Sequence, residues 1–162
     1  MEKKEESSRD ITEEYAVLKS EYDLPEWQGL AEDFDVEKIC EKETSFLVRE
    51  IRRAMNEKLS AYLHLFETLI NPASPPMFVF SVLRKISNED KEKIKEIYKK
   101  LSKMQLTIMK LDTIYSEENE AKFVKDIFLE WQDLKKEIHE IVGKFDDSFS
   151  DDDNSSKGRY FG

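Results

Sequence analysis

The chain has 162 residues, a length typical of one domain, and its single cysteine excludes both an intramolecular disulfide framework and a cysteine-based structural zinc site. Its formal net charge of −10 repels phosphate backbones and anionic lipids, so we expect no membrane binding and no direct nucleic-acid binding. The 4 glycines, at 29, 143, 158 and 162, form no glycine-rich phosphate loop, which excludes P-loop and Rossmann sites.

The acidity is concentrated at the two ends of the chain. Residues 1–34 hold 11 acidic and 4 basic side chains, whereas residues 35–143 hold 20 and 19. We expect residues 1–9 to be disordered, because they are charged and show no periodicity. This polar start predicts no signal peptide, and no apolar run is long enough to cross a membrane, so we expect a cytoplasmic protein.

A short N-terminal helix is predicted at residues 10–22. Asp10 and Glu13 fit a capping box. Apolar residues then recur at helical spacing, at Ile11, Tyr15, Leu18 and Tyr22. The helix should end before Pro25, because the residue that precedes a proline disfavours the helical region. A further short helical turn is expected from the spacing of Trp27, Leu30 and Phe34.

The longest predicted helix covers residues 36–70, which contain neither glycine nor proline and carry apolar side chains at mostly helical spacing. Residues 71–76 hold three of the 4 prolines and interrupt the helical pattern. A short helix is predicted at residues 76–86, since Pro76 suits a first helical position and no second β-rich run offers a strand to pair with. This segment is apolar nearly all round, so it is either central or covered by another chain.

Two further helices are predicted at residues 88–114 and 116–143. Ser87 and Ser116 mark their starts, and Gly143 marks the end of the second. The connection between the two helices is short, so we expect an antiparallel hairpin. The first helix is rich in lysine and the second in acidic residues, which favours their pairing modestly.

Together these elements predict an all-α fold, an antiparallel helical bundle of about four main helices with a short N-terminal helix. Residues 10–143 should form this single domain, and residues 144–162 a flexible acidic tail with an aromatic end. The expected core positions are Leu63, Phe66, Phe80, Leu83, Ile97, Leu101, Phe123, Ile127 and Trp131.

We find no clear catalytic or metal-binding constellation, so we expect no metal and no cofactor. Cys40 has no histidine near it in the sequence, and neither His64 nor His139 completes the Glu-x-x-His pattern of helical metal sites. Carboxylates at metal-ligand spacing do occur, as Glu117 with Glu120, Glu130 with Asp133, and Glu37 with Glu41. Such spacings arise by chance in an acidic chain, but they leave a Mg²⁺-dependent hydrolase of a phosphorylated small molecule as an alternative.

Two groups of residues are candidate partner-binding sites. Arg49, Arg52 and Arg53 share one side of the helix at 36–70, and guanidinium groups bind carboxylates in a bidentate manner. Internal pairing, for example with Glu50, is the alternative. The second group is the chain end, Tyr160, Phe161 and Gly162, because aromatic anchors and free C-termini recur in interfaces.

Part of the chain resembles a known family. The run Arg49-Glu50-Ile51-Arg52-Arg53, followed by a loop and by Asn88-Glu89-Asp90-Lys91-Glu92 leading to Tyr98, is similar to the helical domain of GINS-type replication proteins. Residues 101–143 depart from that pattern, and we see no small β-domain, so we do not assign the chain to the family. A second alternative is a subunit of a nucleic-acid-processing assembly, which would use the face of Arg49, Arg52 and Arg53 without itself binding nucleic acid tightly.

The sequence favours a non-enzymatic interaction or adaptor protein that engages a protein partner, in one version through its C-terminal tail. A homodimer is one form of that partnership, since the apolar segment at 76–86 requires cover.

Overall fold

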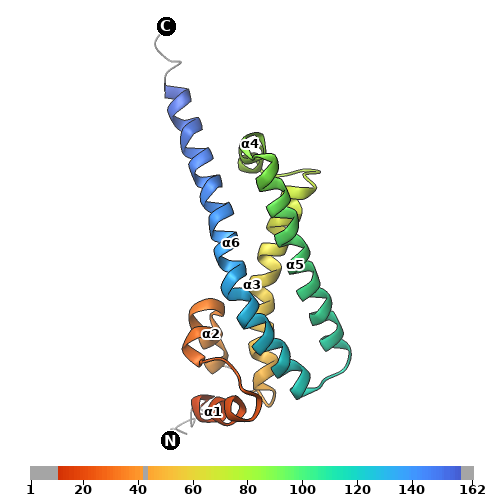
Figure 1. Cartoon of the computed structure of the whole chain (residues 1–162). Helices are drawn as coiled ribbons and strands as arrows, with labels where there is room; N and C mark the ends of the chain where they lie inside the picture. Colours follow the sequence, from red (N-terminus) through yellow and green to blue (C-terminus); the bar gives the residue numbers. More distant parts are fainter. Residues whose placement is uncertain (1–10, 42–43, 158–162) are drawn as a thin grey trace, which may run out of the picture. The chain divides into compact units, whose positions relative to one another are not determined.

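The computed structural model describes residues 11–41 and 44–157, with the backbone alone described at 41 and 148–157 (Figure 1). Every regular element in these ranges is helical, which confirms the all-α class. The elements are α1 (Ile11–Tyr22), α2 (Trp27–Phe34), the 3-10 helix η1 (Val36–Glu41), α3 (Leu47–Ile70), α4 (Met77–Lys85), α5 (Asn88–Thr113) and α6 (Glu117–Lys157). None of the helices in the described ranges has the length and apolar character that a membrane span requires.

The chain divides into two compact units. The first comprises Met1–Lys58 and Ile108–Leu129, and the second comprises Leu59–Thr107 and Glu130–Gly162. Helices α3, α5 and α6 therefore contribute residues to both units. The single domain expected at residues 10–143 stays a prediction.

The first unit begins with the two helical segments predicted near the N-terminus. Helix α1 ends at Tyr22, before Pro25, and Asp23 then adopts a left-handed φ of 54°. The hydroxyl of Tyr15 donates a 2.6 Å hydrogen bond to the carbonyl of Pro25, and its ring meets Trp27 edge-on with centroids 5.0 Å apart. These contacts hold α1 against the start of α2, where the sequence predicts a further helical turn.

Helix α2 packs closely against α6 within the first unit. A Cβ atom placed on Gly29 would lie 2.9 Å from the ring Cζ of Phe128. Leu30 and Phe34 of the same helix are buried. The glycine is therefore the residue that lets the helix backbone approach the aromatic ring.

The helix predicted at residues 36–70 is wrong at its start. The chain first forms η1, and α3 begins only at Leu47. Between them, the hydroxyl of Thr44 accepts a 3.0 Å hydrogen bond from the backbone N–H of Phe46, a local bond that competes with a helix. The apolar pattern also has a gap here, because the five residues before Phe46 are all polar or charged.

The second unit contains α4 and the first part of α5. Helix α4 begins at Met77, directly after Pro76, close to the predicted start. The hydroxyl of Ser87 accepts a 3.1 Å hydrogen bond from the backbone N–H of Asp90 and donates one of 2.7 Å to its carboxylate, which confirms the predicted start of α5. A hydrogen bond from Lys144, with a smaller contribution from Ser87, holds the pKa of Asp90 below its ordinary value.

Ion pairs join α5 to α6 within the second unit. The Nζ atom of Lys93 lies 3.4 Å from the carboxylate of Glu140, and that of Lys100 lies 2.8 Å from Glu137. Later residues of α5 thus meet earlier residues of α6, which is the predicted antiparallel order. The lysine-rich and acidic faces of these helices are complementary here, although exposed pairs each stabilise a fold by only about 0–1 kcal/mol.

Helix α6 begins at Glu117, directly after Ser116 as predicted, but its predicted end at Gly143 is wrong. The helix continues to Lys157. No described glycine has a positive φ, and a glycine inside a helix costs only about 1 kcal/mol. Gly143 therefore does not interrupt α6. The flexible tail expected at 144–162 stays a prediction, and its last five residues lie outside the described ranges.

Most of the expected core is buried. Six of the nine expected positions are buried, namely Phe66, Ile97, Leu101, Phe123, Ile127 and Trp131. Leu63 and Leu83 are only half-buried. The prediction for Phe80 is wrong, because its side chain is 46% exposed. The fully buried residues of α4 are Val79 and Val82 alone, so only one face of this short helix is fully covered.

Candidate functional site

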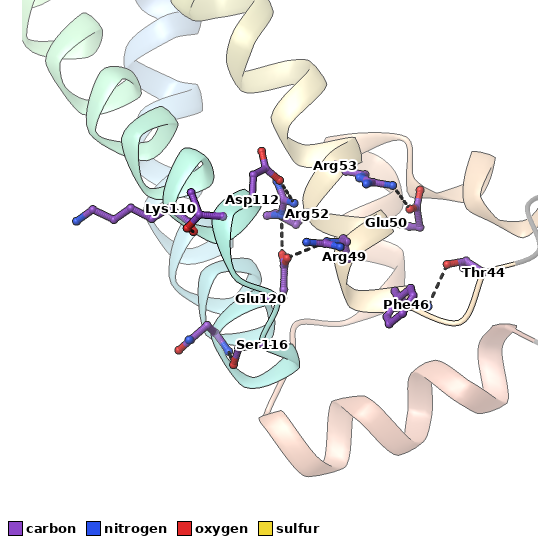
Figure 2. Close-up of polar contacts among 12 residues, drawn as sticks. Thr44, Phe46, Arg49, Glu50, Arg52, Arg53, Lys110, Asp112, Ser116 and Glu120 are labelled. Atoms are coloured by element: carbon purple, nitrogen blue, oxygen red, sulfur yellow. Dashed lines mark hydrogen bonds and ion pairs between the residues drawn. The ribbon is translucent and has the colours of Figure 1, made fainter.

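The three arginines predicted to bind a partner lie in the first turns of α3, and they meet acidic side chains of their own chain (Figure 2). Arg53 is about half exposed, and its Nη1 lies 2.6 Å from the carboxylate of Glu50, one turn earlier. This is the internal pairing that the sequence offers as the alternative to partner binding.

Arg52 forms the most enclosed ion pair of the described residues. Its side chain is 1% exposed, and that of Glu120 is 0% exposed. The Nε of Arg52 lies 2.6 Å from Oε2 of Glu120, and its Nη2 lies 2.6 Å from Oδ1 of Asp112. Removing two charges from water costs several kcal/mol for each ion unless they are paired and hydrogen-bonded, and both conditions are met here.

Arg49 completes this cluster from the turn before. Its Nε lies 3.3 Å from Oε1 of Glu120, and its guanidinium carbon lies 4.9 Å from the ring centroid of Tyr115. The ring of Tyr115 in turn meets Phe46 edge-on, with centroids 4.9 Å apart. Burial is the main cause that raises the pKa of Tyr115, and the negative charge of Glu117 raises it further. The arginine is thus held by both a carboxylate and an aromatic face.

The arrangement ties α3 to the end of α5 and the start of α6 within the first unit. Figure 2 shows the guanidinium groups of Arg49 and Arg52 pointing at one carboxylate, that of Glu120. Arg52 therefore presents almost no surface to a partner. Arg53, on the more open side of α3, is the member of the trio that a partner could reach.

Among the carboxylates at metal-ligand spacing, Glu117 and Glu120 have other contacts. Both oxygens of Glu120 accept hydrogen bonds from arginines, and Glu117 accepts one of 3.1 Å from the hydroxyl of Tyr22. Burial, followed by that hydrogen bond, raises the pKa of Tyr22 to about 12. Glu130 and Asp133 are exposed on α6. Within the described ranges, no three histidine, cysteine or acidic side chains converge in a way that could hold a metal.

The remaining candidates for chemistry are on the surface. Cys40 is exposed at the end of η1, and Glu37 is exposed on the same element. His64 and His139 are exposed on α3 and α6. The side chain of Glu41 lies outside the described residues, as do Tyr160, Phe161 and Gly162 at the chain end.

Exposed apolar side chains are clustered on α4. Met77 is 83% exposed, Phe78 is 52% exposed and Phe80 is 46% exposed. The sequence predicts that this segment is either central or covered by another chain. Within the second unit it is neither central nor fully covered, because only the face with Val79 and Val82 is buried. We call the three exposed side chains the α4 apolar surface.

A groove lies beside this surface in the second unit, with a volume of about 320 Å³. Its lining residues come from three helices and the segments beside them: Leu69 and Ile70 of α3, Pro72 between α3 and α4, Leu83 of α4, Ile86 directly after α4, and Lys91, Ile94 and Lys95 of α5. We call it the α4 groove. Met77, Phe80 and Leu83 are spaced three residues apart, so they share one ridge of the helix, which leads from the apolar surface to the groove.

Comparison of the chain with protein-family models, with curated proteins and with solved structures finds no match. The resemblance to GINS-type proteins therefore rests on the residues quoted for it alone.

Sequence reasoning missed the α4 groove and the partner of Arg52. The groove joins residues of three helices, and Arg52 is 68 positions away from Glu120 along the chain. One signal was present, namely two lysines one helical turn apart, Lys91 and Lys95, beside Ile94. These lysines indicate a groove only when another helix is known to lie beside them. The spacing of residues along one helix does not show which helix that is.

Proposed function

We propose that this chain is a non-enzymatic interaction protein that engages a protein partner through the α4 apolar surface. The observation that carries the proposal is the exposure of Met77, Phe78 and Phe80 on one short helix. Clustered exposed apolar residues mark interaction sites, and aromatic and methionine side chains are enriched in protein interfaces. Scattered single exposures would need no such explanation.

The energy available from this surface supports a specific interaction. Fully burying a phenylalanine or methionine side chain stabilises a complex by about 1.5–3 kcal/mol. Phe78 and Phe80 are each about half exposed, so covering both and Met77 contributes about 3–5 kcal/mol in total. This amount suits a small group of hot-spot residues that a polar rim completes.

In this proposal the helices form the antiparallel bundle expected from the sequence, and α4 is the part of it that meets the partner. The half-exposed Arg53 and the chain end at Tyr160, Phe161 and Gly162 are additional partner contacts. A homodimer is included, since the partner protein can be a second copy.

Site-specific photo-crosslinking in native lysate tests the proposal. The full chain carries a photoreactive phenylalanine analogue at Phe78 in one sample and at Leu106 in the control, which is also exposed and lies in the same unit. We expect a discrete crosslinked protein from position 78, lost when Phe80→Ser is added, and none from position 106. Equal crosslinking from both positions, or none from either, contradicts the proposal.

A second version of the chain, ending at Lys157, isolates the role of the chain end. Because α6 continues to that residue, this truncation removes the last residues without cutting the helix. Loss of the crosslinked partner in this version assigns a contact to the chain end, and an unchanged pattern removes that contact from the proposal.

A further inference from the structure

We infer that the α4 groove receives an amphipathic helix of a partner protein that carries acidic residues beside its apolar face. The inference rests on the proposed function and specifies the chemistry of the partner. It is carried by the aliphatic lining of the groove, by its two lysines, and by the α4 apolar surface, in which Phe80 lies one helical turn from the groove residue Leu83.

The floor of the groove is aliphatic. Leu69 and Ile70 of α3, Leu83 of α4, Ile86 directly after α4, and Ile94 of α5 line it. A volume of about 320 Å³ lies at the lower end of the range for ligand pockets, so it suits a few inserted side chains and not a large cofactor. A helix laid in such a groove inserts residues spaced three and four positions apart.

The rim of the groove is basic. Lys91 and Lys95 line it from one side of α5, one helical turn apart. Lys91 is exposed. The Nζ of Lys95 lies 2.6 Å from the carboxylate of Glu92, but both side chains are exposed, so a partner's carboxylate can replace Glu92 at little cost in free energy. Arg84 is also exposed, near the end of α4. Acidic side chains one turn apart on a partner helix match the spacing of the two lysines.

The segment that contains Lys91 and Lys95 is basic, although the protein as a whole is acidic. Residues 84–100 carry seven basic and four acidic side chains, whereas the whole chain has a net charge of −10. At physiological ionic strength charges more than about 8 Å apart are largely screened, so the local lysines decide which side chains are stabilised in the groove.

The same observations disfavour two other occupants. In a symmetric dimer the same patch occupies both sides of the interface, which would bring the lysine pairs of two copies toward each other. An anionic membrane would attract the lysines, but a concave groove does not suit a flat lipid surface.

Fluorescence anisotropy with a designed probe tests the inference. The probe is a labelled helical peptide of about 18 residues with leucines at helical spacing and glutamates on its flanks, and the control peptide has lysines in place of the glutamates. The full chain is compared with Lys91→Glu/Lys95→Glu and with Lys99→Glu/Lys103→Glu. The second pair changes the net charge equally, on the same helix and at the same spacing, but does not line the groove.

We expect saturable binding of the glutamate peptide, weakened about tenfold by Lys91→Glu/Lys95→Glu and about twofold or less by the control pair. Phe80→Ser should also weaken binding, because its ring lies on the ridge that leads to the groove. Circular dichroism of each variant confirms that the helices are retained.

Several outcomes overturn the inference. They are no binding of the glutamate peptide, equal binding of the lysine peptide, or equal losses for the two lysine pairs. Binding of the chain to anionic vesicles that Lys91→Glu/Lys95→Glu abolishes would assign the groove to a membrane. Concentration-dependent dimerisation abolished by the same pair would assign it to a second copy. If position 78 still crosslinks a protein while the peptide fails, the proposed function stands and only the acidic class of partner is wrong.

Discussion

Replacing Arg52 with methionine should be among the most destabilising single changes in this protein. Methionine keeps much of the side-chain volume but removes the guanidinium group that lies 2.6 Å from Glu120. The glutamate is 0% exposed and would keep only Arg49, whose Nε is 3.3 Å away. Leaving a buried charge without its close partner costs about 3–5 kcal/mol, which is a large share of the 5–15 kcal/mol that stabilises a typical domain.

The stability cost of a substitution should fall in the order Arg52, Glu120, Asp112. Glu120→Gln leaves Arg52 bound to Asp112 and keeps an acceptor oxygen, so it should cost about 2 kcal/mol. Asp112→Asn affects a carboxylate that is 56% exposed and screened by water, so it should cost about 0–1 kcal/mol. The double variant Arg52→Met/Glu120→Met removes both buried charges and should recover most of the stability lost in Arg52→Met.

Urea denaturation at neutral pH, followed by circular dichroism, measures these free energies of unfolding. Parallel transitions with the same dependence on urea are needed, so that a shift of the midpoint reports stability alone. The reasoning is refuted if Asp112→Asn costs as much as Arg52→Met, or if the double variant costs the sum of its two single changes.

Further predictions concern glycine, pH and the core. Gly29→Ala should destabilise the fold by about 1–2 kcal/mol, because the new methyl group meets an aromatic ring, whereas Gly143→Ala has open space and should stabilise it by about 0.5–1 kcal/mol in thermal melts. A destabilising Gly143→Ala would contradict the helix through that position. Asp90→Asn should lower stability near neutral pH by about 1 kcal/mol. Because Lys144 lowers the pKa of Asp90 in the folded state, the stability that Asp90 contributes is present above the ordinary aspartate pKa and is lost as pH falls through the folded pKa. Urea titrations of both proteins at several pH values will show this loss. Trp131→Ala should cost about 3–5 kcal/mol in the same assay, and a change under 1 kcal/mol would be inconsistent with its burial.

Features with local physical causes were predictable from the sequence. The starts of α5 and α6 follow Ser87 and Ser116, because a serine hydroxyl satisfies the free N–H groups of a helix N-terminus. The end of α1 before Pro25 has an equally local cause, the crowding of the residue before a proline.

Features that depend on weighing weak local signals were predicted wrongly. Gly143 lies inside α6, since the cost of one glycine is smaller than the gain from continuing a helix. The polar stretch before Phe46 contains Thr44, whose hydroxyl accepts a hydrogen bond from the backbone N–H of Phe46 and so competes with helical hydrogen bonding. A count of apolar spacing over the whole of residues 36–70 does not detect so short an interruption.

The candidate site depended on contacts between distant parts of the chain. Composition shows that α4 is apolar, but the exposure of Phe80 and the burial of Val79 depend on which neighbours cover each side. The arginine trio was recognised as a charged cluster, yet the burial of Arg52 depends on Glu120, far away in the sequence. Such long-range partners are not encoded in local periodicity.

The position of Met77 has a consequence for the chemistry of the α4 apolar surface. Its thioether is 83% exposed, whereas Met55 and Met104 are enclosed in the core. Peroxide in the surrounding solution therefore has direct access to this sulfur, and methionine sulfoxide is polar where the thioether is apolar. The surface that we propose for partner binding is thus also a place where mild oxidation would change the protein outside its core, and a methionine sulfoxide reductase would reverse that change.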